Sequence, residues 1–214
     1  MTFEQLVARA RALSKAGERA ILGISGAPAA GKTTRAKELT AALGHGVAHV
    51  PMDGFHLADA ELDRLGNRDR KGAPDTFDAL GYAAMLRRLR EDTDDIIYAP
   101  GFERVIEQPI AGAIPVFRSA RLIITEGNYL LLGTGGWQRV RPLLDEVWYA
   151  DLDSRTRLDR LVDRHVRFGK DPTAAVAWAT GTDERNAQLI AATREHADLI
   201  VPAGVLRKIG APVS

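Results

Sequence analysis

Hydrophobic residues gather in five short runs, and the longer stretches between them repeat apolar positions with helical spacing. The strand-like runs lie at residues 20–25, 47–52, 121–125, 146–150 and 198–201. The helical patterns are clearest at residues 78–90, 154–166 and 183–196. Strands that alternate with helices are typical of an α/β sheet whose strands are mostly parallel. We therefore expect a single α/β domain over residues 1–214.

Two further segments have patterns of their own. Residues 2–15 alternate apolar and charged positions like an amphipathic helix, and they lack the apolar core of a signal peptide. Residues 96–117 are less regular. They predict either an additional hairpin or a loop that covers a substrate.

Composition and charge narrow the functional classes. The 214 residues include no cysteine, which excludes disulfides, thiolate metal sites and cysteine nucleophiles. The formal net charge of +1 does not favour a nucleic-acid binder. No apolar run approaches the ~20 residues of a membrane span. We expect a cytoplasmic enzyme without nucleic-acid or membrane partners, and the sequence leaves a homodimer open.

The stretch GISGAPAAGKTT, at residues 23–34, carries the strongest chemical signal. It follows an apolar run and precedes a helix-permitting segment, and its inner part fits the P-loop pattern G-x-x-x-x-G-K-[ST]. Glycines let successive N–H groups converge on an anion, and the following helix adds the positive end of its dipole. A plain glycine-rich turn is the alternative. The candidate phosphate-binding residues are Gly26, Ala29, Ala30, Gly31, Lys32, Thr33 and Thr34.

Within this loop, Lys32 is expected to reach the outer phosphates and the Thr33 hydroxyl to ligate magnesium. Acidic residues follow two of the predicted strands. Asp53 comes just after the second and Glu126 ends the third. Acids at strand ends beside a P-loop can hold magnesium or accept a proton from an attacking hydroxyl, and each could also belong to a simple turn. His56 could hydrogen-bond the acceptor, or it could cap or pack.

Four segments in this order resemble one protein family: GISGAPAAGKTT, MDGFHL, RKGAPDTFD and ITEGNYLLL. They are similar to the P-loop kinases that include pantothenate kinase, uridine kinase and phosphoribulokinase. Within this group, the chain most resembles a subgroup labelled fructose transport system kinases. The resemblance spans residues 20–201 and implies a P-loop NTPase three-layer fold with a five-stranded parallel sheet core and a helical lid. It also implies transfer from ATP with Mg²⁺ to a small hydroxyl-bearing acceptor.

The resemblance assigns roles to individual positions. Asp53 is similar to the aspartate that orients or deprotonates the acceptor hydroxyl, and Glu126 to the acid near magnesium. Arg70 and Lys71 resemble a substrate-side loop, although a solvated basic turn is the alternative.

Residues 155–172 resemble the lid that closes over ATP. The cations considered in this segment are Arg157, Arg160, Arg164, Arg167 and Lys170. Lid cations stabilise the charge that spreads over the transferred phosphoryl oxygens. We expect Arg164 and Arg167 to be the lid arginines, whereas a surface ion pair is the alternative for Arg157.

The nature of the acceptor stays open at this point. A nucleoside, a sugar and a pantothenate-like molecule all fit, because specificity resides in variable loops such as residues 58–70 and 97–114. The alternative function is a transport-linked regulatory P-loop ATPase that needs no small acceptor. A GTPase and an ABC-type ATPase are disfavoured because N-K-x-D and L-S-G-G-Q are absent. Trp137, Trp148 and Trp178 are expected to pack in the core or lid.

Overall fold

A five-stranded parallel sheet forms the centre of the computed structural model, which describes residues 1–14, 18–169 and 171–205. Its order is β2-β5-β1-β6-β7, so the first strand of the chain lies in the middle. The strands are β1 (Ala20–Ser25), β2 (Val47–Pro51), β5 (Leu122–Gly127), β6 (Glu146–Asp151) and β7 (Leu199–Pro202). Every residue of β1 and β5 is buried, as expected for parallel strands covered on both faces.

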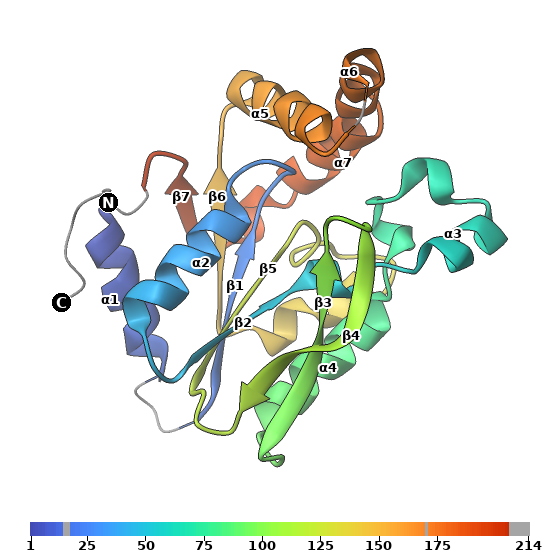
Figure 1. Cartoon of the computed structure of the whole chain (residues 1–214). Coiled ribbons are helices and arrows are strands. Elements are labelled where there is room, and N and C mark those ends of the chain that lie inside the picture. Colours follow the sequence, from blue (N-terminus) through green and yellow to red (C-terminus); the bar gives the residue numbers. More distant parts are fainter. Residues whose placement is uncertain (15–17, 170, 206–214) are drawn as a thin grey trace.

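One face of the sheet is covered by α1 (Phe3–Leu13) and α2 (Lys32–Leu43) (Figure 1). Thr2 caps α1 in a capping box with Gln5, which fixes where this helix begins. Leu6 of α1 and Leu39 of α2 pack in one apolar cluster with Ile24, Ile124 and other sheet residues. This cluster is the core of the first layer.

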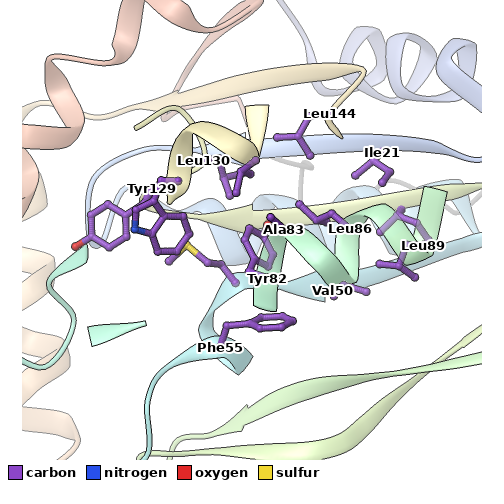
Figure 2. Close-up of a cluster of buried hydrophobic side chains, with 14 of the residues drawn as sticks. Ile21, Val50, Phe55, Tyr82, Ala83, Leu86, Leu89, Tyr129, Leu130 and Leu144 are labelled. Carbon is purple, nitrogen blue, oxygen red and sulfur yellow. The ribbon is translucent and has the colours of Figure 1, made fainter. Parts of the chain in front are cut away.

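The other face is covered by α4 (Ala79–Glu91) and by the short helical segments after β5. Asp78 caps α4 by accepting a hydrogen bond from the Gly81 N–H. Figure 2 shows how Tyr82 and Leu86 of α4 pack beside Ile21 and Leu130. The chain therefore has three layers around two apolar cores.

Residues 96–117 form an antiparallel hairpin of β3 (Ile96–Glu103) and β4 (Gln108–Phe117). Ile97 and Ala99 of β3 alternate with exposed positions and join the core beside α4. The hairpin is a separate two-stranded sheet. Of the two forms expected for this segment, the structure has the hairpin. Its connecting turn lies at the same end of the molecule as the carboxyl ends of the main-sheet strands (Figure 1).

Three helices lie beyond the carboxyl end of the main sheet (Figure 1): α5 (Ser154–Arg167), α6 (Pro172–Thr180) and α7 (Thr182–Ala191). The short α3 (Asp59–Leu65) lies at the same end of the molecule. Gly169, at φ +92°, follows α5 and precedes α6, so this region is a helix–turn–helix. The carboxyl ends of the strands thus open toward α3, α5 and the hairpin turn.

The predicted P-loop three-layer fold with five parallel strands is confirmed. The helix expected over residues 183–196 is shorter, because α7 ends at Ala191 and a separate 3-10 turn covers Arg194–His196. Helices α3 and α6 were not expected from the hydrophobic pattern. Lys15 and Lys170, which belonged to two predicted segments, lie outside the described residues.

Candidate active site

A cleft of about 630 Å³ opens at the carboxyl end of the sheet. It lies where β1, β2 and β5 end, and the hairpin turn and the helices α5 to α7 form its other walls. Its lining includes Lys32, Thr33, Asp53, His56, Lys71, Phe102, Arg104, Glu126, Asn128, Arg164, His165, Trp178 and Asp183. In open α/β sheets this edge is where ligands bind.

The loop between β1 and α2 has the backbone that an anion-binding turn requires. Gly26 has φ +147°, and a Cβ there would lie 2.8 Å from the Ala150 carbonyl oxygen, so no side chain fits. Gly31 has φ +85° and forms the N-cap of α2. Ala29 adopts φ +63°, which is uncommon for a residue with a side chain. This strained turn leads directly into the N-terminus of α2, where free N–H groups attract anions.

Lys32 lies at the first turn of α2 and is only 7% exposed. Its Nζ donates to the Asn128 Oδ1 over 2.6 Å and to the Ala27 carbonyl oxygen over 2.9 Å. Burial lowers the pKa of Lys32 to about 8, and Glu126 and Asp53 partly oppose this shift. The ammonium group is held at the floor of the cleft by oxygen acceptors that a phosphate could replace.

Thr33 and Glu126 form a buried oxygen pair beside Lys32. The Thr33 hydroxyl donates to the Glu126 Oε1 over 2.8 Å, and Glu126 is 3% exposed. Burial raises the pKa of Glu126, and the nearby Asp53 raises it further, while Lys32 and Thr33 act in the opposite direction. Burial and the neighbouring Asp53 disfavour the ionised form of Glu126, so a cation bound next to it would stabilise that form.

Asp53 lies in a 3-10 turn, Met52–Phe55, that directly follows β2. Its Oδ2 accepts a hydrogen bond of 3.0 Å from the Arg104 Nη2, and Arg104 belongs to the turn of the hairpin. Asp53 also borders the same cleft as Glu126. The structure therefore brings both strand-end acids to one site, as their positions at parallel strand ends require.

His56 is held by packing as well as by hydrogen bonding. Its Nδ1 lies 2.8 Å from the Asp53 carbonyl oxygen, and its ring stacks on Phe77 and Phe102 at centroid distances of 3.9 and 4.7 Å. Burial lowers the pKa of His56, so the ring is neutral near pH 7. The side chain both packs in the wall and lines the cleft.

Of the two basic residues proposed for the substrate-side loop, Lys71 lines the cleft. Its Nζ bonds to the Asp59 Oδ1 over 2.6 Å and to the Glu107 carbonyl oxygen. Arg70 instead pairs with Asp75 on the outer side of the same turn and is not part of the cleft wall described by the structure.

The two arginines proposed for the lid also differ. Arg164 lines the cleft and is half-buried, and burial lowers its pKa, although a guanidinium stays charged. Arg167 is exposed one turn further along α5 and is not part of the described lining. Arg157 is buried and pairs with the partly exposed Glu184 of α7, so it joins two helices rather than forming the surface pair that was the alternative.

Several cleft residues were missed by the sequence reasoning. Asn128 accepts a hydrogen bond from Lys32, and Arg104 donates one to Asp53. The Asp183 carboxylate of α7 lies 2.7 Å from the His165 Nε2. Asn128 lies two residues after Glu126 at the same strand end, and this position was a usable signal. No local sequence motif identifies Arg104 or Asp183 as cleft residues, because they reach the cleft only through the folding of the hairpin and α7. Trp137 and Trp148 are buried core residues, whereas Trp178 lines the cleft.

No protein-family model matches the chain, but individual proteins do. A Schizosaccharomyces pombe protein provisionally named uridine kinase C227.14 is 32% identical over 217 residues, covering 97% of this chain and 91% of the relative. The chain belongs to the P-loop kinases. The Aspergillus versicolor ATP-dependent kinase-like protein notR' is 34% identical over 71% of this chain and 93% of its own length.

A solved structure supports the same family. A Silicibacter protein provisionally named a fructose transport system kinase superposes with a TM-score of 0.86 and is 36% identical. The match covers 94% of this chain and 100% of that one. The resemblance inferred from the motifs is confirmed, and with it a phosphotransferase that uses ATP with a divalent metal. No helix of this P-loop kinase within the described ranges is long and apolar enough to cross a bilayer.

The donor set of the cleft fits a small divalent cation. Thr33 and Glu126 supply a hydroxyl and a carboxylate oxygen, which are ligands that Mg²⁺ prefers. Within the described residues, no group of three or more His, Asp or Glu side chains forms a metal cage. Mg²⁺ needs only one or two protein ligands when phosphates and waters complete its shell, so the residues present are sufficient.

Proposed function

We propose that this P-loop kinase transfers the γ-phosphoryl group of ATP, with Mg²⁺, to a hydroxyl of a small metabolite. The observation that carries this proposal is that Lys32, the Thr33–Glu126 pair and Asp53 all border one cleft. A phosphate site, a metal site and a second carboxylate then border the same cleft. These are the parts that phosphoryl transfer requires.

The nucleotide side is formed by the loop before α2. Its N–H groups and the helix N-terminus would hold the phosphates, and Lys32 would leave Asn128 for the outer phosphate oxygens. Thr33 and Glu126 would hold Mg²⁺, which when bound neutralises charge on the phosphate oxygens. Arg164 approaches from α5 and would stabilise the negative charge that develops in the transition state.

The acceptor side is formed by Asp53 and its surroundings. Asp53 would orient the acceptor hydroxyl and accept its proton as the phosphoryl group moves. Its contact with Arg104 favours this role, because the hairpin turn holds the carboxylate toward the acceptor side of the cleft. A role of Asp53 as a further Mg²⁺ ligand is the alternative, and the two make different predictions for nucleotide affinity.

The proposal is tested by acceptor-dependent ADP release. The enzyme would be supplied with ATP and Mg²⁺ and screened against nucleosides, sugars and pantothenate-like vitamins, with mass spectrometry of the product. We expect ADP release to rise with one class of acceptor and to yield a phosphorylated product. The matched control is Arg88→Gln, which changes an exposed arginine of α4 that pairs with Asp94. ATP hydrolysis at one rate regardless of acceptor would support a regulatory ATPase instead.

A further inference from the structure

Arg104 has hydrogen-bonding capacity that its protein contacts leave unused. The Arg104 Nη2 donates to the Asp53 Oδ2 over 3.0 Å, and the two side chains are 45% and 26% exposed. Across the described part of the chain, Asp53 is the one residue recorded as accepting a hydrogen bond from Arg104. A guanidinium carries five N–H donors. Most of them are therefore available to a ligand in the cleft.

Two of the other cations that line the cleft are already neutralised. Lys71 and Arg68 both pair with Asp59, over 2.6 and 2.7 Å, although both side chains also line the cleft. Phe102 holds Arg104 in place from the other side, because the Arg104 Cζ lies 5.9 Å from the ring centroid. Arg164 approaches from α5 and is assigned above to the phosphoryl group, so Arg104 is the described cation next to Asp53 that is placed to bind the acceptor.

We propose that the acceptor is a small hydroxy acid whose carboxylate binds Arg104 while its hydroxyl faces Asp53; this inference rests on the function proposed above. A guanidinium can hold two carboxylates at once, one at each edge of its planar fork. Arg104 would thereby screen the repulsion between Asp53 and the acceptor carboxylate. The same contact would fix where the anionic group lies relative to the reacting hydroxyl.

The rim of the cleft favours a single carboxylate over a more highly charged group. Asp69 and Glu107 are exposed and line the same cleft. A phosphate ester carries close to two negative charges near pH 7 and would be repelled more strongly by these acids. A neutral alcohol would leave the free N–H groups of Arg104 to water and would gain no charge-assisted bond.

Matched pairs of acceptors test this inference. The values of kcat/KM would be measured for glycerate against glycerol and for pantothenate against panthenol, with uridine, fructose and fructose 6-phosphate as further probes. We expect a hydroxy acid to be preferred over its neutral partner by about 10- to 100-fold, since a charge-assisted hydrogen bond is lost in the neutral one. Arg104→Gln should abolish that preference, Arg104→Lys should keep part of it, and Arg88→Gln, at an exposed position of α4, should leave it unchanged.

Binding without turnover gives an independent readout. Glycerate and pantothenate would be titrated calorimetrically into the wild type and Arg104→Gln, each with Mg²⁺ and a non-hydrolysable ATP analogue. The inference is supported if the affinity for glycerate or for pantothenate is at least tenfold lower in Arg104→Gln than in the wild type. Preference for uridine, fructose or fructose 6-phosphate, or binding unchanged in Arg104→Gln, overturns it while the kinase function stands. If no probe causes acceptor-dependent ADP release, the proposed function itself is contradicted.

Discussion

The Thr33 hydroxyl lies 2.8 Å from the buried Glu126 carboxylate at the floor of the cleft, beside the buried Lys32. Burial raises the pKa of Glu126, so part of the ligand-free enzyme carries a protonated Glu126 at pH values where a free glutamate is ionised. A bound cation requires the ionised form. Binding of Mg²⁺–ATP should therefore expel a proton.

From this relationship we expect Mg²⁺–ATP affinity to rise as the pH increases above the ordinary glutamate value of about 4.3 and through the raised pKa. Ligand-free stability should change in the opposite direction. The protonated form favours the fold at low pH, and this contribution is lost as the pH rises through the raised pKa. Calorimetric titration and thermal unfolding between about pH 5.5 and 8.5 measure both trends.

Glu126→Gln is the control, because it keeps the shape and removes the titration. This variant should bind Mg²⁺–ATP more weakly, and both pH trends should be shallower than in the wild type. The ionisation of ATP itself is common to both proteins and cancels in the comparison. Identical pH trends in the two proteins would contradict a role of Glu126 in binding the metal.

Lys32→Met should lower turnover by about 10²-fold or more, because a charge that contacts the transferred phosphoryl group is lost. The ligand-free fold should survive. Burial already lowers the pKa of Lys32 to about 8, so removal of the charge relieves a desolvation cost and offsets the lost bonds to Asn128 and Ala27. Turnover and thermal unfolding test the two statements. A loss of many degrees in Tm without nucleotide would show that the lysine is mainly structural.

Arg164 and Arg167 form a matched pair on α5, one inside the cleft wall and one exposed. Arg164→Gln should reduce kcat by about 10²-fold with a smaller effect on ATP binding, since lid cations act on charge developed in the transition state. Arg167→Gln should change kcat less than threefold. The kcat and the KM for ATP of both variants, measured by steady-state kinetics, test this prediction. Equal effects would mean that α5 reorients before transfer and that the position of Arg164 in the cleft is not what matters.

The sequence predicted the parts of the site that local patterns encode. The P-loop follows β1 and opens α2 as its spacing indicates. Asp53 follows β2 and Glu126 lies near the end of β5, and these strand ends meet at one edge of the sheet. Helix α6 also has a local signal, because the break at Gly169 and Pro172 predicts a helix–turn–helix. Asp171 caps it, and Pro172 occupies its first turn.

Other parts of the site depend on long-range folding. Arg104 belongs to a polar turn with no motif, and it meets Asp53, 51 positions away in the sequence, only because the hairpin packs beside the 3-10 turn after β2. Arg70 and Lys71 are neighbours in the sequence, yet one pairs outward with Asp75 and the other inward with Asp59. The backbone conformation of the turn determines which of the two side chains points into the cleft, and this conformation cannot be predicted from the residue types alone.

The central claim is that Asp53 serves the acceptor, and Asp53→Asn tests it most directly. The substitution keeps the size of the side chain and removes the charge that orients or accepts the hydroxyl proton. Mg²⁺–ATP would be titrated calorimetrically into the variant, and turnover would be measured with the acceptor found by the ADP-release screen. The account predicts that turnover falls by about 10²–10⁴-fold while nucleotide affinity changes only modestly. Parallel losses of affinity and turnover would contradict it and make Asp53 chiefly a metal ligand.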